Sequence, residues 1–135
     1  MIPGELITIM VGLDGYLVVV ALLVGSFINL AADRLPRGES VIRPRSHCRS
    51  CGRVLDVVDL IPVGGYLIRR GRCATCGVSI GVSSPAVEAV CGAAMLSSVT
   101  LLGLWDGALV GFAAISVVGV VVLNLGFSRL RRATR

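Results

Sequence analysis

The sequence reads GYLVVVALLVGSFINLAA at residues 15–32, and this uncharged, aliphatic stretch decides the fold class. A helix needs about 20 mostly apolar residues to cross about 30 Å of hydrocarbon. The apolar segment extends back to about Leu6, with Asp14 at its outer edge. No basic region precedes it, as a secretory signal peptide would require, so we predict a retained membrane-spanning helix.

Two further apolar segments predict two more spans, at 85–104 with Glu88 near its start and at 108–127 without a charge. The residues between them, Trp105-Asp106-Gly107, allow only a tight turn, so we expect an antiparallel helical hairpin. The composition agrees, because 55% of the 135 residues are hydrophobic and 16% are charged, against about 45–50% and about 25% in a soluble domain. This excludes a disordered chain and argues against a water-soluble single domain.

The basic residues predict the orientation of the chain. All 13 are arginines, of which nine lie between Arg34 and Arg72 and four lie at 129–135. Because arginines collect on the cytoplasmic side of a membrane, we predict the N-terminus outside and the C-terminus inside. The net charge of +5 then reflects topology and does not indicate nucleic acid binding, for which Tyr66, the only aromatic residue of the loop, offers no stacking platform.

The fold class predicted is an all-α integral membrane protein with three transmembrane helices. Its parts are an N-terminal segment with the first helix at 1–32, a cytoplasmic loop at 33–84, a hairpin of two helices at 85–127 and a basic tail at 128–135. Small and polar residues on the spans predict helix packing faces; they are Gly25, Ser26, Asn29, Gly92, Ala93, Ser97, Ser98, Gly107, Gly111 and Gly119.

The loop contains two CxxCG turns that repeat after 25 residues, Cys48–Gly52 and Cys73–Gly77. Two such turns are typical of a zinc ribbon, in which four cysteines hold one ion tetrahedrally. We therefore predict that Cys48, Cys51, Cys73 and Cys76 bind structural Zn²⁺ and that short β-hairpins surround them. An iron centre would use the same four thiolates. Disulfides are disfavoured because the loop is placed in the reducing cytoplasm.

Other polar residues carry weaker expectations. His47, beside Cys48, could replace a cysteine as a ligand, and Cys91 is expected to be a small apolar residue of the second span. Glu88 is expected in the first turn of that span, with Ser84 as N-cap and Pro85 following it, either paired with a loop arginine or at a functional site.

Residues 59–70 are expected to form a short strand or a membrane-surface loop packed against the ribbon. In this segment and just beyond it, Arg69, Arg70 and Arg72 would enforce topology or bind anionic lipid head groups or a cytoplasmic partner.

Together these residues resemble the N-terminal domain of the bacterial prepilin peptidases, membrane aspartyl proteases that also N-methylate pilins. The first span ends in GSFINL followed by RLPR at 34–37, where the family has GSFLNV and RLPR. The loop matches at Ser46, Cys48, Cys51, Ile61, Pro62, Tyr66, Leu67, Arg70, Gly71, Arg72, Cys73, Cys76, Pro85, Val87 and Glu88. The resemblance implies a multi-pass protein of the bacterial cytoplasmic (inner) membrane.

Departures from the family pattern decide the function expected here. Arg49 replaces a proline of the first turn, Leu60 an asparagine, and Ser83-Ser84 an Arg-Tyr pair. The family's protease uses two aspartates on later helices, yet no Asp or Glu follows Asp106. Because aspartyl proteolysis needs two carboxylates sharing a proton, we expect no catalytic residue in these 135 residues.

Two functions remain open from the sequence. The first is a protease-dead accessory or structural subunit of a larger membrane complex, with other integral membrane subunits and lipid as partners. The alternative is a component of prepilin processing that acts on pilin-like substrates, either as an N-methyltransferase or as half of a split peptidase. No nucleic acid partner is expected under either.

Overall fold

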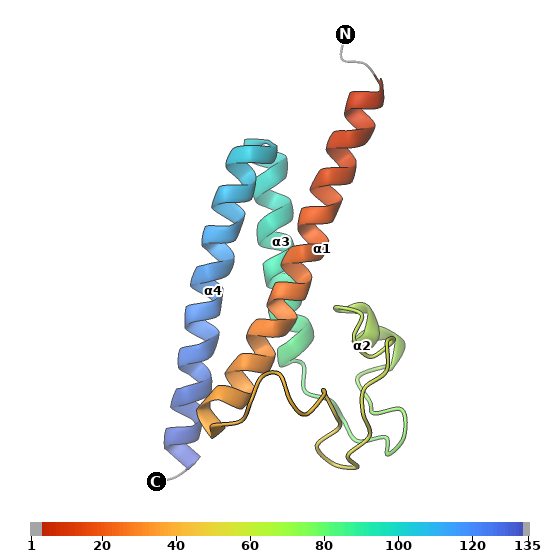
Figure 1. The fold of residues 1–135 in the computed structure, drawn as a ribbon, viewed down its shortest axis with the longest axis vertical. Helices are drawn as coiled ribbons and strands as arrows, with labels where there is room; N and C mark the ends of the chain where they lie inside the picture. Colours follow the sequence, from red (N-terminus) through yellow and green to blue (C-terminus); the bar gives the residue numbers. More distant parts are fainter. Residues whose placement is uncertain (1–3, 134–135) are drawn as a thin grey trace.

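The computed structural model describes residues 4–133, and within them three long helices form a bundle with an irregular loop at one end (Figure 1). The first three residues of the predicted 1–32 segment and the last two of the tail lie outside this range. The elements are α1 (Gly4–Arg34), the 3₁₀ turn η1 (Leu35–Arg37), α2 (Gly64–Ile68), α3 (Ser83–Leu102) and α4 (Leu104–Ala133).

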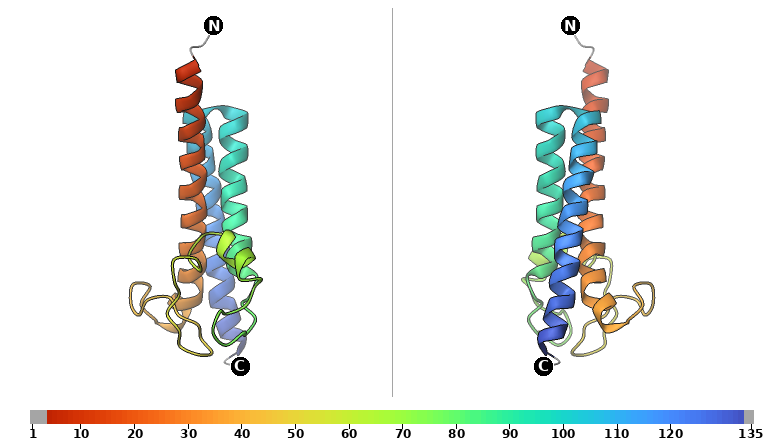
Figure 2. Two further views of the ribbon diagram at one scale, coloured as in Figure 1. Left: turned by 90° about the vertical axis from the view of Figure 1, so that its right-hand side faces the viewer. Right: turned by 90° about the vertical axis from the view of Figure 1, so that its left-hand side faces the viewer.

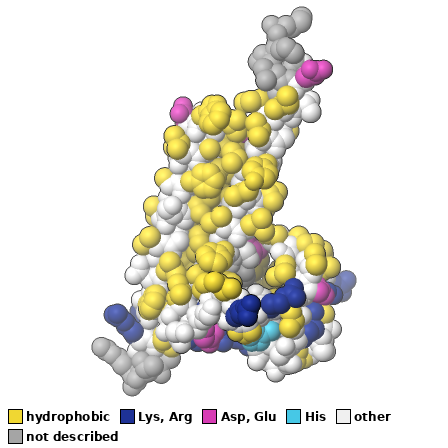
Figure 3. Space-filling model, viewed as in Figure 1, with side chains coloured by type: hydrophobic (Ala, Val, Ile, Leu, Met, Phe, Trp, Pro, Cys, Tyr) yellow, Lys and Arg dark blue, Asp and Glu magenta, His cyan; other side chains and the backbone are white. Residues whose placement is uncertain are grey.

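The three long helices confirm the predicted spans in number and place. Each is long and apolar enough to cross a membrane, over Ile7–Arg37, Ser83–Leu102 and Leu104–Arg132. Hydrophobic side chains cover the face of the bundle seen in Figure 3, as expected for a surface in contact with lipid tails. The direction in which the chain crosses the membrane stays a prediction.

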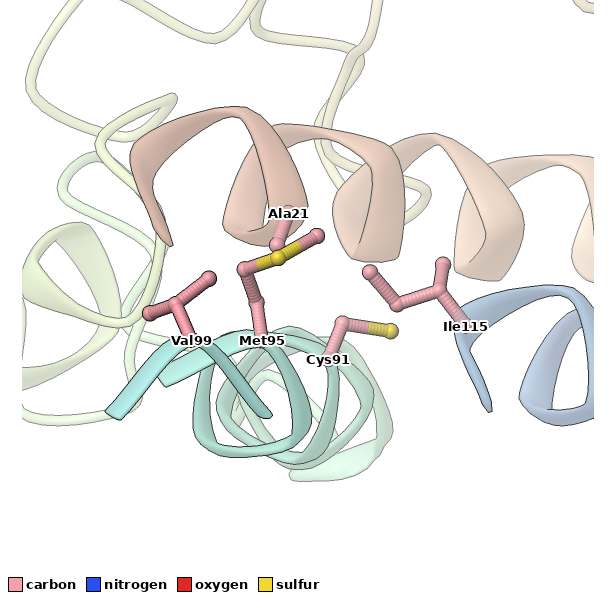
Figure 4. Packing of buried hydrophobic residues seen from close by; sticks show 5 residues of the cluster. All are labelled: Ala21, Cys91, Met95, Val99 and Ile115. Carbon is pink, nitrogen blue, oxygen red and sulfur yellow. The ribbon is translucent and has the colours of Figure 1, made fainter. Parts of the chain in front are cut away.

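The bundle packs around side chains from all three helices. The fully buried Cys91 and Met95 come from α3 and lie between Ala21 of α1 and Ile115 of α4 (Figure 4). This confirms that Cys91 is a small apolar core residue. The core is narrow because the helices approach one another closely.

Glycines allow this close approach, which confirms the glycines of the predicted packing faces, whereas Ala93 and Ser97, predicted with them, are exposed. A Cβ atom at Gly25 would lie 2.9 Å from the Cα of Glu88 on α3, and one at Gly107 would lie 2.5 Å from the Cα of Val99. Such distances leave no room for a side chain. The small residues therefore set the spacing of α1, α3 and α4.

The hairpin between α3 and α4 is present, but its predicted turn at Trp105-Asp106-Gly107 is wrong. The chain reverses at Gly103, and those three residues lie in the first turns of α4. The backbone angles of Gly103, φ +81° and ψ 173°, belong to a region that is essentially confined to glycine. The chain therefore reverses at Gly103, the residue of this turn that can adopt these backbone angles.

The predicted β-hairpins of the loop are also wrong. Between residues 33 and 84 the structure has no strand, and only two isolated antiparallel bridges, His47–Val54 and Arg72–Ser79, mark the cysteine turns. In each turn a single pair of residues forms a bridge before the two arms of the turn separate, and one bridge is too short to make a strand. Likewise, residues 59–70 hold the short helix α2 instead of a strand, because Gly64 and Gly65 let the chain pack tightly, Gly65 against the carbonyl of Val58.

Candidate metal centre

The two cysteine turns have the same backbone structure, and we call residues 46–55 the first knuckle and 71–80 the second. In both knuckles the N–H of the first cysteine donates a hydrogen bond to the carbonyl of the residue five positions later. The N–H of the glycine donates to the carbonyl of that first cysteine. Gly52 and Gly77 have φ of +72° and +68°, which glycine adopts without steric cost. The bonds are Cys48 to Arg53 (2.8 Å), Cys73 to Val78 (2.9 Å), Gly52 to Cys48 (2.9 Å) and Gly77 to Cys73 (3.0 Å).

The knuckles bring the four predicted sulfur ligands together. The Sγ atoms of Cys48, Cys51, Cys73 and Cys76 all lie within 4.8 Å of one another. Across the knuckles, Cys48 and Cys76 are 3.8 Å apart and Cys51 and Cys73 are 3.9 Å apart. A tetrahedral ion with bonds of about 2.3 Å to sulfur separates its ligands by about 3.8 Å. The four thiols therefore have the donor type and spacing to hold one metal ion.

The electrostatics of the cluster favour a cation. The N–H groups of Cys76 and Thr75, with the Arg53 guanidinium, lower the pKa of Cys73 to about 6. At Cys51 the N–H of Arg53 lowers the pKa, but desolvation and the neighbouring thiols outweigh it and raise the pKa to about 11. Thiolates this close together repel one another, and a bound cation removes that repulsion.

His47 does not take part in this cluster. Its Nδ1 lies 3.0 Å from the carbonyl oxygen of Arg45, and its ring is exposed. The four cysteines are the group of ligand atoms that gathers among the described residues, so the expectation of His47 as a replacement ligand finds no support.

A salt-bridge network that the sequence did not reveal supports the cluster. The Asp59 carboxylate, with 5% of its side chain exposed, pairs with Arg53 at 2.5 Å and with Arg69 at 2.9 Å. Burial disfavours ionisation of Asp59, but the N–H of Asp56 and the two guanidinium groups outweigh it and hold its pKa below the usual range. Because the N–H of Cys48 donates to the carbonyl of Arg53 at 2.8 Å, the network connects the cysteine cluster to the chain before α2.

A second group of contacts ties the first knuckle to the end of α1. Arg49 forms an ion pair with Asp33, which also pairs with Arg37 at 2.5 Å. Arg49 thus has a structural role where the family carries proline. The buried Arg34 donates to the carbonyls of Ser40 and Pro44, at 2.9 Å each, and holds the connecting segment.

Glu88 lies on α3 facing the loop and is 6% exposed. Its carboxylate accepts hydrogen bonds from the N–H of Val63 (2.6 Å) and the hydroxyl of Ser84 (2.9 Å). The expected pairing with a loop arginine is wrong among the described residues, since the loop offers a backbone N–H instead. Ser84 is not the N-cap, because α3 begins at Ser83 and the Ser84 hydroxyl turns toward Glu88.

A cleft of about 1320 Å³ separates the loop from the helices. Its walls combine apolar side chains of α1, including Phe27 and Leu30, with the polar groups of Asp33, Arg69 and Glu88. The cleft thus borders both the loop that carries the four cysteines and the membrane helices.

The comparisons with known proteins agree with this arrangement. Residues 19–102 match the Bacterial Peptidase A24 N-terminal domain. Similar proteins include the prepilin leader peptidase/N-methyltransferases of Myxococcus xanthus (46% identical, covering 57% of this chain and 23% of the relative), Bacillus subtilis (40%, covering 55% and 30%) and Burkholderia pseudomallei strain K96243 (30%, covering 83% and 45%). The chain therefore spans less than half the length of these relatives. No solved structure matches it significantly.

Proposed function

The chain belongs to the family of the Bacterial Peptidase A24 N-terminal domain. We propose that it is a module of a bacterial cytoplasmic membrane complex and that a metal ion holds its loop together. In this role it positions other integral membrane subunits and cleaves no peptide bond by its own residues. The observation that carries the proposal is the closed cluster of four thiols. Four cysteines fill a tetrahedral shell and leave no position for water or substrate, so the metal acts on structure.

Zn²⁺ is the ion that we propose for this cluster. Its preference for four thiolates in a tetrahedral array matches the sulfur spacing of 3.8 and 3.9 Å between the knuckles. Iron bound by the same four sulfurs is the alternative. Bound zinc would supply folding free energy to a loop whose regular structure amounts to one turn of 3₁₀ helix and α2.

The carboxylates near the cleft support a structural role. Asp33 is paired with arginines, and Glu88 accepts two hydrogen bonds. Aspartyl proteolysis instead needs two carboxylates that share a proton. The contacts of Asp33 and Glu88 connect the loop to α1 and α3, as a scaffold requires.

Co-purification of the full chain in mild detergent tests the scaffold role. We expect a stoichiometric complex with other integral membrane proteins, and we expect Cys73→Ser to lose both the metal and the partners. Retention of α-helical circular dichroism by Cys73→Ser serves as the control for the bundle. Recovery of the chain alone from gently solubilised membranes contradicts the proposal.

A second candidate is a component of prepilin processing, favoured by the large cleft beside the loop. The relatives are named for this activity. Under this candidate the purified chain has one of two activities. It transfers a methyl group from S-adenosylmethionine to a pilin-like peptide, or it cleaves a pilin-like peptide when an aspartate-bearing partner is present. Absence of both reactions in the complex recovered above excludes this candidate.

A further inference from the structure

The short helix α2 and the chain before it expose an unusual number of large apolar side chains. Leu67 and Ile68 are 66% and 61% exposed, and Leu60 and Ile61 are 49% and 45% exposed. We call these four residues, with the exposed Arg70 and Arg72, the α2 patch. A loop surrounded by water rarely gathers apolar side chains in this way, and such patches mark surfaces that contact a membrane or another molecule.

The depth of α2 along the bundle places this patch beside the membrane. The N–H of Val63, directly before α2, donates to Glu88 at 2.6 Å, and Glu88 lies in the second turn of the candidate span Ser83–Leu102. Figures 1 and 2 agree, since α2 lies beside the lower part of α3 and above the lower ends of α1 and α4. The patch is therefore level with the ends of the membrane helices.

The charges around α2 indicate the chemistry of the molecule that would contact the α2 patch. Arg69 is engaged by Asp56 and Asp59, whereas the side chains of Arg70 and Arg72 are exposed and form no ion pair among the described residues. Figure 3 shows hydrophobic side chains over this segment and basic side chains next to them. Apolar side chains beside free guanidinium groups complement the acyl chains and phosphate of an anionic lipid.

We propose that the α2 patch is an interfacial membrane anchor that binds anionic phospholipid. Leu67 and Ile68 enter the boundary between head groups and acyl chains, and Arg70 and Arg72 bind the lipid phosphate. This site is independent of the proposed scaffold role, since it involves only the α2 patch and the bilayer. It also holds the loop that carries the four cysteines against the membrane.

Lipid competition tests the charged part of the anchor. The full chain, with its metal, is exchanged between phosphatidylglycerol and phosphatidylcholine, and the lipids that stay bound are counted by native mass spectrometry. The double variant Arg70→Gln/Arg72→Gln is expected to lose preference for phosphatidylglycerol by about five-fold for each arginine. Arg45→Gln is the matched control, because Arg45 occupies the position of Arg70 in the first knuckle and is also exposed.

Arg45→Gln should keep the preference of the unmodified chain. A loss of about five-fold in Arg45→Gln, equal to the loss expected for each arginine of the double variant, would show an effect of net charge alone and overturn the site. An unchanged preference in the double variant overturns it as well.

Tryptophan fluorescence tests the apolar part of the anchor. Trp105→Phe/Leu67→Trp carries a single tryptophan in the patch, and Trp105→Phe/Ala74→Trp carries one in the exposed second knuckle. In vesicles with lipids brominated near the head group, we expect quenching at position 67 at least two-fold above that at position 74. Equal quenching by lipid at the two positions overturns the anchor. So does protection of position 67 from both bromolipid and acrylamide, which identifies a protein covering instead.

Discussion

At the scale of single residues, Glu88 and Val63 show how the loop is held on the bundle. Val63 has a φ of +57°, a left-handed conformation that is strained for a β-branched residue. Its N–H donates to the buried Glu88 carboxylate at 2.6 Å. Strained conformations persist only where neighbouring contacts enforce them, so Glu88 acts as the group that fixes the entry into α2.

Replacement of Glu88 tests this contact. Glu88→Leu leaves the N–H of Val63 without an acceptor, and we expect a loss of about 1–3 kcal/mol in the free energy of unfolding. Glu88→Gln is the control, because its amide oxygen still accepts from Val63 while its NH₂ group donates to the Ser84 hydroxyl. Thermal unfolding of both variants in detergent gives the comparison. Equal stabilities of the Leu and Gln variants contradict the role assigned to Glu88.

Asp59 gives a prediction with a defined pH dependence. Its pKa is held below the usual aspartate value of about 3.9. The carboxylate therefore stabilises the loop at neutral pH, and this stabilisation is lost as the pH falls below about 4 toward the lower folded-state pKa. Asp59→Asn should be less stable than the unmodified chain at pH 7, and the difference should shrink below pH 4. Limited proteolysis of the loop across this pH range measures it; a constant difference refutes the assignment.

At the scale of elements, the spans and the knuckles follow from local sequence, and the rest of the loop does not. Helix length and apolarity are properties of contiguous residues, and each CxxCG turn is closed by its own hydrogen bonds. In contrast, α2 depends on the contact of Gly65 with Val58 and on the hydrogen bond from Val63 to Glu88, which lies 25 positions later. The partners of Asp59 lie up to 10 residues away. No local sequence pattern indicates such contacts. The sequence alone therefore led us to expect strands where the structure has α2.

The turn between α3 and α4 allows an element-scale prediction. Gly103→Ala forces a side chain into a conformation that costs about 1–3 kcal/mol, so the hairpin should lose that much stability. Gly12→Ala is the matched control, because a Cβ atom there meets nothing within 4 Å and alanine favours helix over glycine by about 0.5–1 kcal/mol. Unfolding in detergent should rank Gly12→Ala above the unmodified chain and Gly103→Ala below it. The reverse order would disprove the position of the turn.

At the scale of the whole molecule, a rigid bundle carries a loop that has little core of its own. The buried hydrophobic cluster comes from α1, α3 and α4, while the loop depends on the cysteine cluster, the network around Asp59 and the contacts of Asp33 and Glu88. Removal of the metal should therefore release the loop and spare the helices. A rigid bundle with a separately stabilised loop is what we expect of a module that presents the loop from a fixed membrane base.

The metal content of the purified full chain tests this account most directly. Elemental analysis should find one zinc per chain, bound by Cys48, Cys51, Cys73 and Cys76. Cys73→Ser should lose the metal and expose the loop to protease while α-helical circular dichroism is retained. Cys91→Ser, which changes a cysteine of the helix core, should keep the metal. A chain isolated under reducing conditions with neither zinc nor iron, yet with a protease-resistant loop, would contradict the account.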